Sequence, residues 1–273
     1  FLTGDEEDAG PLAAARGDLV AAGKWADVAL DFEGLVQVKG ADGIVDMGST
    51  ARRSSDEWTL TVTARSGHSS GIFTPSAGSG AIYELARIVD SFRREVPEDK
   101  LTFNVGLVGG GATAELDPAR IRVSATGKTN IIAGTAFARG DLRAISPEQI
   151  ARAQGKMQAI VARPLPGAKA VLEFAPDGYP PMAPTAGNRA LLARLNGVNR
   201  DMGLPDMGEL DPVKRGAGDI SFVAADVDGL AGLGAAGGGS HAPGETVDIP
   251  SIFRQAKRAA ILMSRLARER RGR

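Results

Sequence analysis

Hydrophobic and polar residues alternate regularly in the middle of the chain, and this pattern predicts β-strands. From Trp58 to Ala64, apolar side chains at every second position alternate with threonines, which is typical of a strand with one buried face. Residues 101–108 alternate in the same way. Three more segments have strand patterns, namely 120–126, 131–143 and 169–175.

Two amphipathic helices separate these strands. Residues 77–94 carry their apolar side chains on one helical face. A second helix begins at the capping box Ser146-Pro147-Glu148-Gln149 and ends before Pro164. The order β-α-β-β-β-α-β over residues 57–175 predicts a four-stranded antiparallel sheet with both helices on one face, which is the ferredoxin-like plan.

The flanking segments predict a different kind of domain. Residues 11–22 predict a helix and residues 26–32 a strand, while 33–56 is a Gly-rich, polar stretch of strand and loop. After the Pro-rich segment 177–184 come a helix at 187–202, a Gly-rich region at 216–240 and a last helix from Ser251. We therefore expect an α/β domain, formed by residues 1–56 and 176–273, with an α+β domain inserted at residues 57–175.

Composition excludes several kinds of function. Lys and Arg number 32 and Asp and Glu 33, so the net charge of −1 offers no basic surface for nucleic acid. No apolar run reaches the ~18 residues that a membrane span needs, so no membrane partner is expected. The chain has no cysteine, which excludes disulfides, thiolate metal sites and a cysteine nucleophile. With only two histidines, any metal site must be rich in carboxylates.

The start of the chain looks truncated. It has no initiator Met, and Phe1-Leu2-Thr3-Gly4 has the pattern of a strand that ends in a turn. We expect that upstream sequence, and with it the N-terminal part of the α/β domain, is missing. The sequence therefore does not indicate the cellular compartment of the protein.

Four places carry candidate chemistry, each with a simpler structural alternative. Asp5-Glu6-Glu7-Asp8 is either a solvated helix start or a pair of carboxylates that serve a metal and a proton. Asp27 lies in an apolar strand and needs a partner, a metal or solvent. His241 comes shortly after three glycines, which would let the backbone approach closely and orient the imidazole ring toward a site; the alternative is a histidine in a surface loop. His68 lies in a Gly/Ser turn that follows a strand.

One glycine-rich motif has the glycine spacing of a dinucleotide-binding loop. Residues 232–237 match the dinucleotide fingerprint, but Gly238, Gly239 and Pro243 cannot open the helix that the fingerprint requires. Nucleotide binding is therefore the weakest of the alternatives.

Taken together, seven motifs resemble the co-catalytic zinc metallopeptidases, which include carboxypeptidase G, succinyl-diaminopimelate desuccinylase, acetylornithine deacetylase and aminoacylase-1. In chain order the motifs are Gly4–Glu7, Ala26–Glu33, Gly67–Ser70, Asn130–Ile132, Gly140–Arg143, Gly216–Asp219 and His241–Glu245. Each motif alone is weak, but their order around an inserted domain is specific.

The resemblance implies a fold, a metal and a role for each site residue. The fold is a zinc-peptidase-like α/β catalytic domain with a ferredoxin-like lid that also makes a homodimer. Glu6 would be the general base, and Glu7 and His241 would bind one of two zinc ions while Asp27 binds the other; cobalt or manganese could replace zinc. His68 would polarise the scissile carbonyl across the dimer, and Asn130, Arg143 and Gly218 would bind substrate.

The resemblance also implies an activity, which is hydrolysis of an amide or peptide bond in a small N-acyl amino acid or short peptide. The family needs a further His and a bridging Asp from upstream, and no His precedes His68 in this chain. The alternative is therefore a non-catalytic dimerisation or binding module that keeps the fold without a complete metal site.

Overall fold

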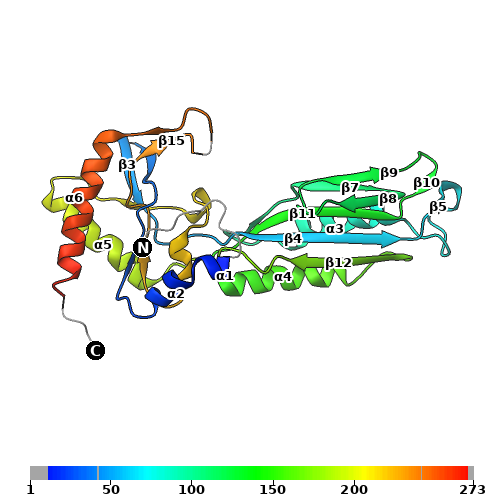
Figure 1. The fold of residues 1–273 in the computed structure, drawn as a ribbon, viewed down its shortest axis with the longest axis horizontal. Helices are drawn as coiled ribbons and strands as arrows, with labels where there is room; N and C mark the ends of the chain where they lie inside the picture. The colour runs from blue at the N-terminus through cyan, green and yellow to red at the C-terminus, as the bar shows by residue number, and fades with distance from the viewer. Residues whose placement is uncertain (1–11, 42, 241, 270–273) are drawn as a thin grey trace. The chain divides into compact units, whose positions relative to one another are not determined.

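The computed structural model describes residues 12–41, 43–240 and 242–269, and the chain forms two compact units (Figure 1). Unit 1 comprises Phe1–Ser54 and Tyr179–Arg273, and unit 2 comprises Ser55–Gly178. Unit 2 is thus inserted in the sequence of unit 1, and its limits lie within three residues of the expected 57–175.

The sheet of unit 2 follows the ferredoxin-like plan. Its strand order is β12-β4-β11-β6, with β7 also paired to β11, and every pair is antiparallel. The strands are β4 (Asp56–Ala64), β6 (Thr102–Phe103), β7 (Leu107–Gly111), β11 (Thr135–Arg143) and β12 (Ala168–Phe174). The fold expected from the alternating pattern is therefore confirmed.

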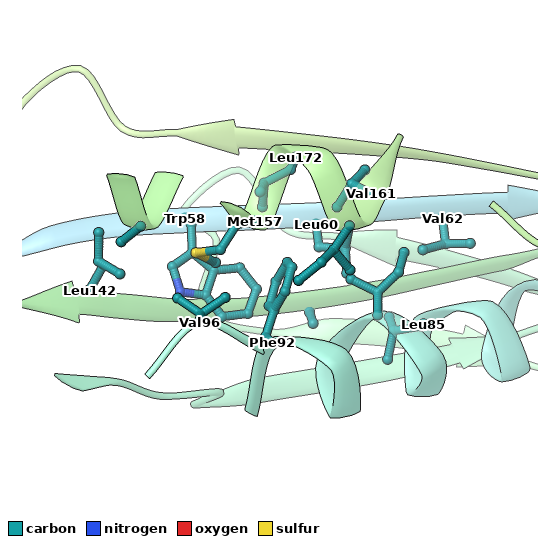
Figure 2. Packing of buried hydrophobic residues seen from close by; sticks show 14 of the residues in the cluster. Trp58, Leu60, Val62, Leu85, Phe92, Val96, Leu142, Met157, Val161 and Leu172 are labelled. Carbon is teal, nitrogen blue, oxygen red and sulfur yellow. The ribbon is translucent and has the colours of Figure 1, made fainter. Parts of the chain in front are cut away.

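Helices α3 (Ala81–Glu95) and α4 (Pro147–Val161) cover one face of this sheet. Figure 2 shows the core between them. The rings of Trp58 of β4 and Phe92 of α3 pack edge to face, with their centroids 5.8 Å apart. The capping box is present, because Ser146 Oγ accepts a hydrogen bond from the Gln149 N–H at 3.2 Å. Burial of these alternating apolar faces stabilises the unit by removing apolar surface from water.

Two expected strands of unit 2 are interrupted. The expected strand 101–108 divides into β6 and β7. Phe103 pairs with Leu142 and Leu107 pairs with Arg139, so the segment 103–107 is one residue longer than the segment of β11 that it faces. One extra residue on one strand is a β-bulge, which breaks a ladder locally. Part of the expected strand 131–143 turns away as β10 (Ile131–Ile132), which pairs with β5 (Gly67–His68).

One hairpin of unit 2 was not expected. Of the expected strand 120–126 only β9 (Val123–Thr126) is a strand, and its partner β8 (Thr113–Leu116) was missed. The expected helix 77–94 begins later, at Ala81, because Gly78 and Gly80 have φ angles of 72° and 80°, which no helix contains.

Unit 1 is built from short strands and two long helices. β1 (Ala29–Leu30) pairs in parallel with β14 (Gly229–Leu230), and α5 (Ala186–Asp201) packs against α6 (Ile249–Leu266). The other strands are β2 (Val36–Gly40), β3 (Gly43–Gly48), β13 (Gly208–Glu209), β15 (Gly237–Gly238) and β16 (Thr246–Val247). Among the described residues, no helix is long and apolar enough to cross a membrane.

Two expectations for unit 1 are corrected by tertiary contacts. The expected helix 11–22 is divided into α1 (Leu12–Ala15) and α2 (Gly17–Gly23) at Arg16, whose buried guanidinium pairs with Asp219 at 2.9 Å. The expected strand 26–32 is reduced to the two residues of β1, because among the described residues only β14 pairs with it.

Candidate functional site

The expected site residues fall into three sets. Glu6, Glu7 and His241 lie outside the described residues. Asp27 and Gly218 belong to unit 1, whereas unit 2 carries His68, Asn130 and Arg143.

His68, on β5, lies beside Asn130, the turn residue that directly precedes β10. The strand register pairs His68 with Ile131, the residue after Asn130. Asn130 Nδ2 lies 3.5 Å from His68 Nε2, and both residues are exposed. The sequence suggested no contact between them, because 62 positions separate them.

The orientation of the His68 ring follows from the local turn. Its Nδ1 accepts a hydrogen bond from the Ser70 N–H at 3.2 Å and lies 2.8 Å from Ser70 Oγ. Nδ1 is thus turned toward Ser70, which leaves Nε2 directed toward the Asn130 amide and solvent.

Arg143 lies at the opposite end of unit 2 from this pair. Arg143 is the last residue of β11, and its neighbour Leu142 pairs with Asp56, the first residue of β4. The strands β5 and β10 lie at the other end of β4, toward which its arrow points (Figure 1). Eight residue steps along β11 at ~3.4 Å each separate Thr135 from Arg143 by roughly 27 Å. Arg143 Nε donates to Asp141 Oδ2 at 2.8 Å. One small substrate therefore cannot contact Arg143 and His68 of the same chain.

In unit 1, acidic residues flank β1 on both sides. Asp27 precedes β1 and is exposed, while Asp31 and Glu33 follow it. In α/β domains with parallel strands, ligands bind beyond the carboxyl ends of the strands. The structure therefore adds Asp31 and Glu33 to Asp27 as candidate ligands.

A buried arginine holds these two carboxylates. Arg52 is 2% exposed, and its guanidinium lies 3.2 Å from Asp31 Oδ2 and 2.9 Å from Glu33 Oε1. It also donates to the carbonyl oxygens of Gly216, at 3.0 Å, and Ala217. Arg215 adds a second ion pair to Glu33 Oε2 at 2.6 Å. Sequence reasoning missed Arg52 and Arg215, since Arg52 stands in a stretch with no clear pattern.

Burial raises the pKa of the Asp31 carboxyl above its usual value, and the nearby Glu33 raises it further. The Arg52 charge acts in the opposite direction and lowers it. The burial effect is the largest because a carboxylate loses its hydration in the interior. Asp31 is thus a carboxyl whose charge depends on Arg52.

Gly218 packs directly over this ion-pair cluster. A Cβ at position 218 would lie 2.5 Å from Glu33 Oε1 and would also collide with the Arg52 guanidinium. The glycine therefore allows the 216–219 loop to approach Arg52. This packing role differs from the substrate-binding role that the resemblance implies, and the latter stays a prediction.

The donor set for a metal can be examined in the described part of the chain only. Among those residues, no three side chains of the metal-binding types come together. Glu33, the carboxylate closest to Asp31 in sequence, is already neutralised by two arginines. The described residues alone do not make a metal site.

Known proteins share the fold and the inserted domain. Residues 50–169 match the M20 family model of a peptidase dimerisation domain. A comparison with curated protein sequences gives no match.

Solved structures of peptidases and amidases are similar to both units. A tripeptidase from Staphylococcus aureus matches with a TM-score of 0.66 and 17% identity, over 89% of this chain and 58% of its own. Aminopeptidase PepT from Bacillus cereus matches with a TM-score of 0.64 and 16% identity, over 97% of this chain and 63% of its own. A hydantoinase/carbamoylase-family amidase from Burkholderia phymatum matches with a TM-score of 0.53 and 17% identity, over 81% of this chain and 50% of its own.

Residues 50–169 of this chain therefore carry a peptidase dimerisation domain of the M20 type. The chain has the α/β peptidase-like fold with a dimerisation lid that the motifs implied. It spans less than two thirds of the length of the tripeptidase and the aminopeptidase that it matches.

Proposed function

We propose that this chain is part of a homodimeric, zinc-dependent hydrolase of amide or peptide bonds that acts on a small N-acyl amino acid or a short peptide. The observation that supports this most is the exposed His68–Asn130 pair on a peptidase dimerisation domain. Two polar side chains that are held side by side without burial are suited to a ligand rather than to packing.

The metal would be held by residues that the motifs assign. We assign Glu7 and His241 to one zinc ion and Asp27 to the other. When bound, zinc would lower the pKa of water and polarise the substrate carbonyl. Cobalt or manganese would supply the same chemistry.

The chain's own residues would move the proton and bind the substrate. Glu6 takes a proton from the attacking water and gives it to the leaving amine. His68 donates from Nε2 to the oxygen on which negative charge develops. Arg143 binds a substrate carboxylate through its guanidinium, with Asp141 fixing the side chain through Nε.

The length of unit 2 supports a site shared between two chains. Arg143 and His68 lie roughly 27 Å or more apart along β11, too far for one small substrate. If a second chain supplies His68 and Asn130, each site combines the Arg143 end of one lid with the His68 end of the other. The dimer would then be a requirement of catalysis.

The test is a Glu6→Gln variant of the full-length protein, assayed on N-acyl amino acids and on dipeptides and tripeptides. We expect turnover to fall by ~10²–10⁴, because removal of a general base costs about that much. Zinc content, measured by mass spectrometry of the metal, should stay at the wild-type level because Glu6 is not a ligand.

Asp8→Asn is the matched control, because it removes a carboxylate from the same acidic cluster without an assigned role. Loss of zinc in Glu6→Gln would contradict the base assignment. A wild-type protein that binds no zinc and hydrolyses none of these substrates would instead favour the non-catalytic dimerisation module.

A further inference from the structure

One residue of unit 2 has a strained backbone. Phe73 has a φ angle of 67°, in the left-handed region that glycine adopts freely and a bulky side chain rarely does. The surrounding loop fixes this conformation, because the Phe73 N–H donates to Gly78 O and the Gly78 N–H donates to Thr74 O, both at 2.8 Å. Thr74 Oγ1 also donates to Gly71 O at 2.8 Å. A costly conformation that is held by several hydrogen bonds indicates a function for the side chain that it positions.

The side chain of Phe73 lies in solvent rather than in the core of unit 2. It is 64% exposed and packs against Tyr83 of α3, which is 55% exposed, with the ring centroids 5.4 Å apart. Because both rings keep most of their surface in water, the pair contributes little hydrophobic stabilisation to the fold. Single exposed apolar residues are ordinary, but two large rings in contact on a strained loop form an apolar patch that indicates a binding site.

One short turn joins Phe73 to His68. His68 is the N-cap of the 3₁₀ turn η1 (Ser69–Gly71), and Phe73 is the second residue after that turn. Three residue steps at ~2.0 Å and two at ~3.4 Å place the Cα atoms of Phe73 and His68 within roughly 13 Å of one another. Phe73 therefore lies at the same end of unit 2 as the His68–Asn130 pair.

Helix α3 brings Tyr83 to this end as well. The Ala81 N–H, at the start of α3, donates to Ala133 O at 2.9 Å. Ala133 directly follows β10, in which Ile131 pairs with His68. The first turn of α3, which carries Tyr83, therefore lies beside the strand pair that carries His68. This end of unit 2 thus presents an exposed polar pair and an exposed aromatic pair together.

We propose that Phe73 and Tyr83 bind the acyl group of the substrate and select N-acyl amino acids with a large apolar acyl group over N-acetyl ones. This inference rests on the proposed function, in which His68 donates to the oxygen of the scissile carbonyl. The carboxylate of the substrate is assigned to Arg143, so the group that remains for the His68 end is the acyl chain on the other side of that carbonyl. An acyl chain that covers the two rings leaves water, and this favours the larger substrate.

The test compares hydrolysis of the N-acetyl and N-(4-phenylbutanoyl) forms of one amino acid by the full-length protein. The wild type should have a kcat/KM about 10–100-fold higher on the larger substrate, since burial of one large apolar group gives roughly that range. Phe73→Ala and Tyr83→Ala should each lose most of this preference, whereas Tyr83→Phe should keep it. Val108→Ala is the control and should change neither rate, because Val108 is 60% exposed but lies on β7, outside this loop.

Phe73→Gly separates the strained backbone from the aromatic side chain. It should lose the preference to the same extent as Phe73→Ala. Its thermal midpoint should lie about 2 °C above that of Phe73→Ala, because glycine adopts a φ angle of 67° without strain. Equal midpoints of the two variants would mean that the loop is not strained in solution, and the argument from strain would fail.

Several results would overturn the proposal. An equal loss of kcat/KM on both substrates in Phe73→Ala would mean that the rings position the lid and do not select the acyl group. Dissociation of the dimer by Phe73→Ala, measured by sedimentation, would make the aromatic pair a contact between two chains. A wild type that hydrolyses the N-acetyl substrate at least as well as the larger one would contradict this inference alone. A wild type that hydrolyses neither would overturn the proposed function and this inference with it.

Discussion

At the scale of single residues, the central core of unit 2 depends on a glycine opposite a tryptophan. Gly140 of β11 is paired with Trp58 of β4, and Trp58 is 1% exposed. A Cβ at position 140 would lie 2.5 Å from Trp58 Cζ2 and would collide with the Asn104 carbonyl oxygen. The glycine in the Gly140–Arg143 motif is therefore explained by packing beneath the indole.

We expect Gly140→Ala to destabilise the protein by about 1–3 kcal/mol or more, as overpacking of a core usually does. Thermal unfolding measures the change as a lower midpoint temperature. Gly155→Ala is the control, because Gly155 lies within α4 and a Cβ there meets nothing within 4 Å. It should raise stability by about 0.5–1 kcal/mol, since glycine is unfavourable inside a helix. Equal effects of the two variants would contradict this account.

At the scale of elements, one carboxylate joins the segment after α3 to helix α4. Glu98 accepts hydrogen bonds from Arg152 at 3.0 Å and Lys156 at 2.9 Å, and Gln149 Nε2 lies 3.5 Å away. The hydrogen bond from Arg152 is the largest of the effects that lower the Glu98 pKa to about 2, followed by the one from Lys156. The ionised carboxylate therefore favours the folded unit.

Acid should release this contact. The Glu98 pKa lies below its usual 4.5 in the folded state, so its contribution is present above that value and is lost as the pH falls from about 5 to 2. In Glu98→Gln, the thermal midpoint should depend less on pH over this range. Carboxyl NMR of the wild type should give a pKa near 2, which should rise toward 4.5 when Arg152 and Lys156 are both replaced by alanine. A wild-type value near 4.5 would contradict the geometry.

At the scale of the whole molecule, the two ends of unit 2 carry different parts of the proposed site. His68 and Asn130 occupy one end, and Arg143 occupies the other. A symmetric homodimer is the simplest assembly that brings the two kinds of end together, since each chain gives and receives the same residues. The dimerisation domain matched by residues 50–169 supports this arrangement.

We expect sedimentation to show a dimer, and His68→Ala to lower kcat by ~10²–10³ with zinc content unchanged, as for loss of one oxyanion donor. Mixing His68→Ala with Glu6→Ala subunits should restore part of the activity, because one site of each mixed dimer combines both intact residues. Mixing His68→Ala with Asn130→Ala should restore none, since both defects lie at the same end of the lid. Recovery in the second mixture, or none in the first, would contradict a shared site.

Several features of this protein follow from the sequence alone, because they depend on contacts within one element. The period of two from Trp58 to Ala64 defines β4, and Ser146 with Gln149 defines the start of α4. The order of the seven motifs predicted a metallopeptidase-like lid inserted in the chain, and residues 50–169 match a peptidase dimerisation domain. The helix and strand order of unit 2 was enough for the ferredoxin-like plan, since few topologies fit that order.

Other features were decided only by the tertiary structure, because they depend on residues far apart in the chain. β1 is two residues long because pairing with β14, not its apolar pattern, limits it. The Arg52 cluster joins residues 31, 33 and 215–217 through one buried guanidinium, and no periodicity encodes such a contact. The contact of His68 with Asn130, and the distance of both from Arg143, come from strand register, which local sequence patterns do not specify across 62 residues.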